Sequence, residues 1–124
     1  MQPIRSMALV VNPGKSGARK LAQEISEKVK ATEIPCEILT EHPLPPGALE
    51  PHDLCCVIGG DGTILGVVPE AARFGVKVLG VNLGKLGFLA TYTPEEIRQR
   101  IERIIAGEYH LDTRSLISCG GQSA

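Results

Sequence analysis

Short runs dominated by apolar residues alternate along this chain with longer segments in which apolar residues recur at helical spacing. Such runs are typical of strands buried on both faces of a parallel sheet. Connections long enough to hold a helix favour crossovers between parallel strands. We therefore expect an α/β domain with helices on both faces of its sheet. The expected strands are Met7–Val11, Cys36–Leu39, Leu54–Ile58 and Val76–Val81, and the expected helices are Ala18–Ala31, Ile64–Phe74 and a third from Pro94 to Gly107.

Turn-forming residues mark the ends of these helices. Thr93 can cap the third helix, with Pro94 at its first position and Glu96 completing a capping box. Gly75 is a stop signal for the second helix. Pro69 lies inside that helix and removes one backbone donor, so we expect a kink or a shorter first piece.

The remaining segments define the expected domain organisation. The proline-rich stretch 41–51 predicts an exposed connection, and Tyr109–Ile117 is a candidate for a further strand. At 124 residues the chain has the length of one domain. We expect residues 1–116 to form that domain and residues 117–124 to be a tail without a pattern.

Charge and composition argue against several classes of function. The net charge of -1 gives no sign of nucleic-acid or membrane binding, and no stretch approaches the roughly 20 apolar residues of a membrane span. The cysteines do not have the spacing of zinc ligands, and we expect them to be reduced thiols in a cytoplasmic protein. We expect the histidines to lie on the surface and not to act as metal ligands or bases. These residues are Cys36, Cys55, Cys56, Cys119, His42, His52 and His110.

A glycine-rich run, Gly59-Gly60-Asp61-Gly62-Thr63, joins an expected buried strand to an expected helix. Glycines let a backbone pass close to a bulky anion, and the amides of a helix start can bind phosphate oxygens. Asp61 is then a candidate Mg²⁺ ligand, a base for an attacking hydroxyl, or both. The structural alternative is a tight turn in which Asp61 caps a helix that begins near Thr63. The doubled glycine after a buried strand favours the functional interpretation.

A second glycine-rich segment, Asn82–Ala90, also follows an expected strand. Its glycines would let it fold over a nucleotide, with Leu86 or Phe88 against a flat base. Taken alone, however, this segment favours the alternative of a turn whose apolar residues pack into the core. Lys15, in the first loop, is a possible anion contact, although a solvated surface lysine is favoured there.

The two glycine-rich segments together resemble the NAD kinase family. Asn82-x-Gly84-x-Leu86-Gly87-Phe88-Leu89 stands at the family's spacing after the first run, and Asn12-Pro13-x-Lys15 and Gly107-x-Tyr109 with Arg114 also fit. The resemblance extends to about Leu116. It implies a Rossmann-like, phosphofructokinase-like amino-terminal nucleotide-binding domain, without the family's β-rich carboxyl-terminal domain.

The resemblance also implies an activity and a set of site residues. The activity is phosphorylation of the adenosine-ribose 2′-hydroxyl of NAD by ATP or polyphosphate, with a divalent metal such as Mg²⁺, to give NADP. Asp61 maps onto the catalytic residue. The expected nucleotide-binding residues are Gly59, Gly60, Asp61, Gly62, Thr63, Asn82, Leu86, Gly87 and Phe88.

Three further expectations accompany this assignment. Without the second domain the chain is expected to have weak activity or none, and to form a homo-oligomer through an exposed apolar face. Its expected partners are small nucleotides. The alternatives are a lipid kinase of the diacylglycerol or sphingosine type, whose members share the Gly-Gly-Asp-Gly-Thr run, and a non-catalytic nucleotide-binding fragment.

Overall fold

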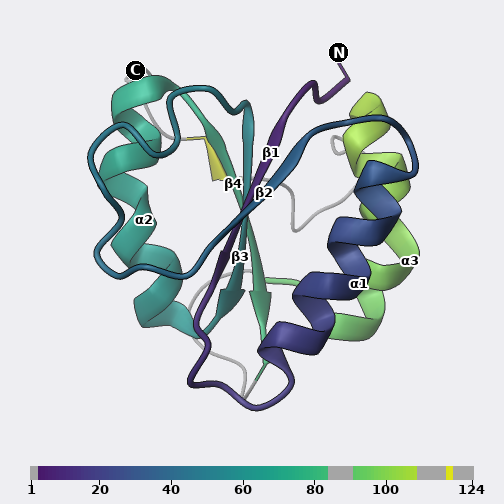
Figure 1. Ribbon diagram of the computed structural model, residues 1–124, viewed down its shortest axis with the longest axis horizontal. Helices are drawn as coiled ribbons and strands as arrows, with labels where there is room; N and C mark the ends of the chain where they lie inside the picture. The colour runs from purple at the N-terminus through teal and green to yellow at the C-terminus, as the bar shows by residue number, and fades with distance from the viewer. Residues whose placement is uncertain (1–2, 84–90, 109–116, 119–124) are drawn as a thin grey trace.

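Four parallel strands form the centre of the fold. The computed structural model describes residues 3–83, 91–108 and 117–118. Its sheet has the order β2-β1-β3-β4-β5, in which β5 alone is antiparallel to its neighbour (Figure 1). The strands are β1 (Met7–Val11), β2 (Cys36–Leu39), β3 (Leu54–Gly59), β4 (Lys77–Asn82) and β5 (Ile117–Ser118).

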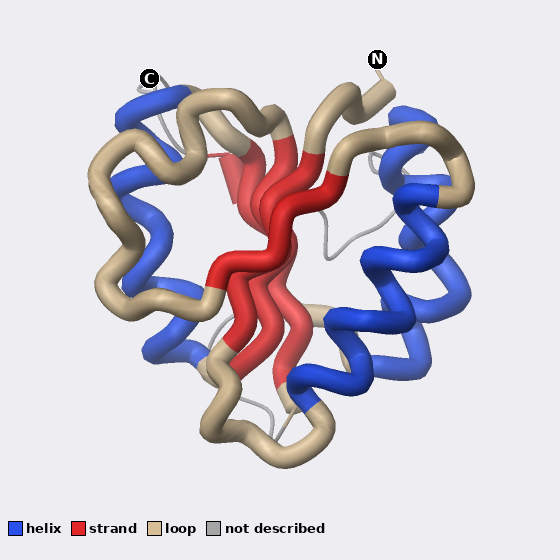
Figure 2. Tube along the Cα trace, in the orientation of Figure 1, coloured by secondary structure: helices blue, strands red, loops and turns tan. Residues whose placement is uncertain are grey.

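Helices cover both faces of this sheet, as the sequence predicts. Helices α1 (Ala18–Lys30) and α3 (Pro94–Arg103) lie side by side on one face, and α2 (Asp61–Phe74) covers the other (Figure 2). A short π-helical turn, η1 (Ile104–Glu108), follows α3, and its Gly107 has a φ of 101°. Among the described residues, no helix has the length and apolar character needed to span a membrane.

Alternating side chains of the buried strands supply two separate cores. Met7, Leu9 and Val11 of β1 pack with the residues of α1 and α3, whereas Ala8 and Val10 pack with those of α2. Cys55 and Cys56 divide in the same way, because successive residues of a strand point to opposite faces. The prediction that these adjacent cysteines occupy opposite faces is confirmed. Cys36, Cys55 and Cys56 are free thiols.

The expected boundaries agree closely with the structure except at α2. This helix begins at Asp61, three residues before the expected Ile64, and continues through Pro69 to Phe74. The expected shorter first piece is therefore wrong. Pro69 is exposed, so water can serve the carbonyl that lacks its usual donor. The predicted stop is confirmed: Gly75 has a left-handed φ of 67°.

The capping box of α3 is confirmed in full. The Thr93 hydroxyl accepts a hydrogen bond from the Glu96 amide at 3.1 Å, and the Glu96 carboxylate accepts one from the Thr93 amide at 2.9 Å. The expected strand within Tyr109–Ile117 falls mostly on residues 109–116, which lie outside the described residues; Ile117 and Ser118 form β5.

The proline-rich connection is exposed only in part. Leu49 within it is completely buried and packs in the core beneath α2. Glu70 of α2 accepts a hydrogen bond from the Gly47 amide at 2.6 Å. This stretch therefore covers one flank of α2 instead of extending into solvent.

His52 corrects the expectation of surface histidines. It is 9% exposed, and its ring joins the Ser6 hydroxyl through Nδ1 (2.7 Å) to the Glu37 carboxylate through Nε2 (2.8 Å). Next to it, Asp53 accepts hydrogen bonds from the Arg5 and Ser6 amides. Sequence spacing could not reveal this because the partners lie 15 to 48 residues apart. His42 is exposed, and His110 lies outside the described residues.

Gly80 controls how closely α2 approaches the sheet. A β-carbon at this buried position would lie 2.7 Å from Ile64 Cδ1 and 3.1 Å from Thr91 Cγ2. We expect Gly80→Ala to lower the free energy of unfolding by about 1–3 kcal/mol in urea denaturation, because the core is overpacked. Ile64→Val removes the nearest atom, so the double variant should recover part of that loss. Strictly additive losses would contradict this account.

The Cys56 thiol should be chemically inert in the native protein. Burial raises its pKa well above the ordinary value, and the neighbouring Cys55 and Cys36 raise it further. Since the thiolate is the reactive form, iodoacetamide at pH 8 should alkylate Cys56 only after unfolding. Mass spectrometry of native and urea-unfolded samples measures this. Equal labelling rates in the two samples would contradict the structure.

Candidate functional site

The carboxyl ends of three parallel strands meet at one edge of the sheet. Strand β3 lies between β1 and β4, and Gly59 at its end pairs with Asn82 at the end of β4. On the other side, the Asn12 amide donates to the Ile58 carbonyl at 3.0 Å, just beyond the end of β1. The loops that follow these strands therefore leave the sheet together, at the edge where the arrowheads of β3 and β4 lie in Figure 1. Ligands of open α/β sheets bind at this edge.

Asp61 is the first residue of α2, and this position excludes the helix-capping role that the sequence left open. The N-cap is Gly60, which is extended (φ -112°, ψ -174°) and has no side chain to accept a hydrogen bond. Asp61 lies in the first turn, where the helix dipole favours an acidic group, and its Oδ1 is buried. The helix start therefore combines a carboxylate with amides that have no partners within the helix.

Gly59 is required by the close approach of Thr63. A β-carbon on Gly59 would lie 2.9 Å from Thr63 Oγ1 and 3.0 Å from Thr63 Cβ. The same hydroxyl oxygen lies 3.5 Å from Asn12 Nδ2, at the outer limit of a hydrogen bond. The first glycine of the run thus serves internal packing, and Thr63 connects the turn to the loop after β1.

No comparable packing contact explains why positions 60 and 62 are glycines. Neither has a positive φ, and a β-carbon on Gly62 would meet no atom within 4 Å. A β-carbon on Gly60 would make only ordinary contacts, both at 4.0 Å, with Lys15. Glycine lowers helix stability relative to alanine, and no packing contact requires it at Gly62 or at Gly66, both inside α2. At Gly62, next to Asp61, the open space leaves room for a group from outside to approach the backbone.

Asn82 lies where the second glycine-rich segment leaves the sheet. The Leu83 amide donates to the Gly59 carbonyl at 3.2 Å, and the Asn82 amide donates to the Tyr92 carbonyl at 3.0 Å. Both ends of the segment are therefore anchored beside the Asp61 turn. Its expected nucleotide-binding residues Leu86, Gly87 and Phe88 lie outside the described residues.

The loop after β1 contributes contacts that sequence reasoning did not assign. Asn12 approaches Thr63, and the side chain of Lys15 reaches Gly60. Their position after a buried strand in a parallel sheet is a signal that could have placed both at this edge.

The described side chains at this edge that could act as metal ligands are few. Within the described parts of the chain, no group of three or more His, Cys, Asp or Glu side chains could hold a metal ion. Asp61 offers one carboxylate in the run Gly59–Thr63. This fits Mg²⁺, which is commonly held by one or two carboxylates together with substrate phosphates.

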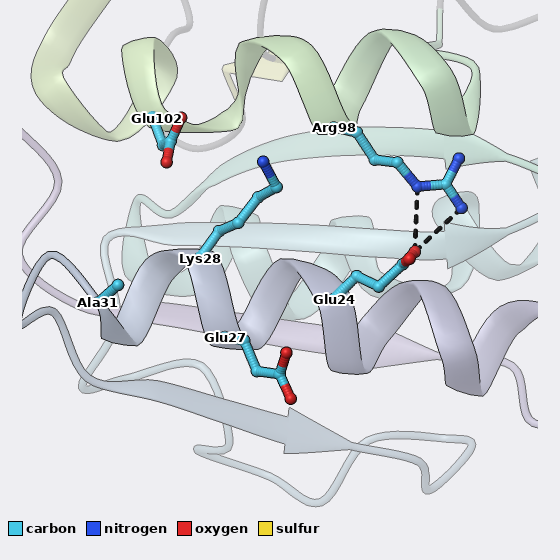
Figure 3. A pocket seen from close by; sticks show the side chains of 6 residues that line it. All are labelled: Glu24, Glu27, Lys28, Ala31, Arg98 and Glu102. Carbon is cyan, nitrogen blue, oxygen red and sulfur yellow. Dashed lines mark hydrogen bonds and ion pairs between the residues drawn. The ribbon is translucent and has the colours of Figure 1, made fainter.

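Two surface hollows lie away from this edge. One, of about 370 Å³, lies between α1 and α3 and is lined by Glu24, Glu27, Lys28, Ala31 (just after α1), Arg98 and Glu102 (Figure 3). There Arg98 holds Glu24 through Nε and Nη2, both at 3.0 Å; both side chains are more than one-third exposed, so the pair stabilises the fold little. The other, of about 390 Å³, lies near Ser6 and His52, before the strands begin. Neither includes a residue of the run Gly59–Thr63.

Comparison with known proteins agrees with this geometry. Two curated relatives are named NAD kinase: that of Nitratidesulfovibrio vulgaris strain DP4 is 40% identical over 97% of this chain, and that of Heliobacterium modesticaldum is 35% identical over 90%. The alignments cover 41% and 43% of those proteins, so the chain spans about two fifths of their length.

A solved structure shares the fold. The crystal structure of an NAD kinase from Archaeoglobus fulgidus in complex with ATP superposes with a TM-score of 0.63, over 90% of this chain and 45% of that one, at 22% identity. Residues 40–109, more than half of the chain, match the profile of the ATP-NAD kinase N-terminal domain. This chain therefore belongs to the ATP-NAD kinase N-terminal domain family.

Proposed function

We propose that this chain provides the amino-terminal half of an NAD kinase site. In that site ATP or polyphosphate phosphorylates the adenosine-ribose 2′-hydroxyl of NAD, and the product is NADP. The observation that carries this proposal is the position of Asp61 at the start of α2, in a turn whose Gly59 pairs with Asn82 and whose Thr63 approaches Asn12, in a chain that belongs to this family.

Asp61 is the proposed catalytic base. Its place at the N-terminus of α2 brings a proton acceptor next to amides suited to phosphate oxygens. In the proposed reaction Asp61 accepts the proton of the 2′-hydroxyl as the phosphoryl group arrives, which is the general-base role that phosphoryl transfer requires. Mg²⁺, when bound, would neutralise charge on the donor phosphates.

The remaining residues of the turn have proposed binding roles. Gly60 and Gly62 leave the backbone open to close approach, and the amides of Asp61, Gly62 and Thr63 are suited to bind phosphate oxygens. Gly59 contributes indirectly because it lets Thr63 pack against β3.

Asn82 and the segment after it are proposed to contact the dinucleotide. Asn82 lies directly beside Gly59, so its side chain starts next to the Asp61 turn. The proposed contacts from Leu86, Gly87 and Phe88 come from a segment whose two ends are anchored at the same place.

The partial length limits what this chain is expected to do alone. Since it spans about two fifths of its curated relatives, we propose that turnover requires the further residues that those proteins carry. Family membership favours the NAD kinase assignment over the lipid kinase alternative. A nucleotide-binding fragment without activity stays the second candidate, and the partial length favours it.

Self-association and a cytoplasmic location stay predictions. Two large apolar side chains are notably exposed among the described residues, Ile38 on β2 (40%) and Leu65 on α2 (55%). They are candidate contact points for a homo-oligomer.

Asp61→Asn separates catalysis from folding. The test uses a chimera in which this chain replaces the matching part of the Nitratidesulfovibrio vulgaris NAD kinase. We expect the chimera to form NADP in a coupled assay and the Asp61→Asn chimera to lose roughly two or more orders of magnitude in kcat, as when a general base is removed. The 124-residue chain alone should show little turnover. Undiminished kcat in the variant, with unchanged thermal unfolding, would remove Asp61 from the mechanism.

Gly62→Ala and Gly66→Ala form a matched pair. Both glycines lie on the exposed side of α2 with no atom near the added β-carbon, so each substitution should raise the free energy of unfolding by up to about 1 kcal/mol. Only Gly62→Ala adds a methyl group beside Asp61, and only it should lower kcat/KM in the chimera. Equal activity of the two variants would argue against ligand approach at Gly62.

A further inference from the structure

Lys15 is held in place at its backbone by the loop between β1 and α1. Its amide donates to the Asn12 carbonyl at 3.1 Å, and its carbonyl accepts from the Ala18 amide at 3.2 Å. Asn12 is itself fixed, because its Oδ1 accepts the Gly14 amide at 3.0 Å and its Nδ2 approaches Thr63. The root of the lysine side chain is therefore positioned relative to the Asp61 turn.

The lysine side chain lies against the second glycine of the run. Nζ and Cε of Lys15 are both 4.0 Å from the place that a β-carbon on Gly60 would take. Lys15 is exposed, and the ion pairs found among residues 3–83 and 91–108 do not include it. An ammonium group thus lies beside the N-terminus of α2 with its charge not neutralised by a carboxylate of this part of the chain.

Gly60 keeps the space next to this ammonium open. Its extended backbone is accessible to any residue, and an alanine there would make only ordinary contacts. The conformation of the chain therefore does not demand glycine. A side chain at this position would, however, stand between the ammonium and any anion bound at the helix start.

The order of the strands assigns Lys15 to one side of Asp61. The loop with Lys15 follows β1, and the segment from Asn82 follows β4, on the opposite side of β3. In phosphoryl transfer the attacking hydroxyl and the leaving oxygen of the donor lie roughly in line on opposite sides of the transferred phosphorus, with the base beside the hydroxyl, so the two substrates must approach Asp61 from different directions. A lysine ammonium is a compact point charge that suits phosphate oxygens, whereas the Asn82 amide is neutral.

We propose that Lys15 binds the polyphosphate chain of the phosphoryl donor, on the β1 side of Asp61. This inference rests on the proposed kinase function and adds to it a donor-binding residue and an orientation for the two substrates. Lys15 would act on donor affinity, through an ion pair with phosphate oxygens, and would leave affinity for NAD nearly unchanged.

The first test measures binding of inorganic tripolyphosphate to the 124-residue chain by titration calorimetry. Lys15→Met should weaken binding roughly tenfold or more, as expected for the loss of one charged hydrogen bond, and Lys15→Arg should restore most of it. Lys30→Met is the matched control: this exposed lysine lies in the last turn of α1, at the other end of the helix. Lys15 is exposed, so thermal unfolding should not change.

The second test uses the chimera and distinguishes the two proposals. Lys15→Met should raise the KM for ATP by a similar factor while the KM for NAD changes less than twofold. Unchanged tripolyphosphate affinity and an unchanged KM for ATP would overturn the role of Lys15 and leave the kinase function intact. An equal rise in both KM values would overturn the assignment to the donor side. A chimera that forms no NADP would overturn the proposed function, whereas the tripolyphosphate titration decides independently whether Lys15 binds a polyphosphate.

Discussion

The close packing of the first turn of α2 onto the ends of β3 and β4 is the contact on which the candidate site depends. Two glycines make it possible. Gly59 admits Thr63 and Gly80 admits Ile64, each at a distance that a β-carbon would not allow. Because protein interiors are close-packed, a methyl group at either place would shift α2. The position of Asp61 relative to Asn82 and Asn12 is set by this contact.

Four glycines at or near the start of α2, Gly59, Gly60, Gly62 and Gly80, therefore fall into two physical classes. Positions 59 and 80 require glycine because protein atoms occupy the space that a β-carbon would take. Gly60 and Gly62 have open space or ordinary contacts beside them and no unusual backbone angle, so packing and backbone strain do not account for them. Gly66 of α2 has the same open space, so the absence of a packing contact does not by itself indicate a ligand. At Gly60 and Gly62 the open space lies beside Asp61, where a ligand is proposed to approach the backbone.

The two edges of the sheet have different organisation. At the edge where the strands begin, His52 and Asp53 join Ser6, Arg5 and Glu37 through side-chain hydrogen bonds. At the edge where the strands end, backbone hydrogen bonds join Asn12 to Ile58 and Leu83 to Gly59, Asn12 accepts the Gly14 amide and approaches Thr63, and His42 Nε2 lies 3.1 Å from the Val11 carbonyl. Lys15, at the edge where the strands end, makes no ion pair among residues 3–83 and 91–108.

The sequence by itself determined the class of fold, the elements and the turn that carries Asp61. Apolar runs and helical spacing are local patterns, and they predicted β1, α1, β2 and the α3 capping box because burial and capping act over a few residues. The family resemblance followed from the same local runs, and the match over residues 40–109 confirmed it. The start of α2 was missed because Gly60, with no side chain to cap, gives no N-cap signal.

Tertiary structure alone decided what lies beside what. The burial of His52 and the approach of Asn12 to Thr63 depend on strand order and register, which join residues up to about 50 positions apart. Whether a glycine is required by packing also depends on neighbours from other elements, so sequence could not separate Gly59 from Gly60. The same holds for Lys15: a lone loop lysine is ordinarily solvated, and only the parallel pairing of β1 with β3 brings its ammonium to the turn that holds Asp61.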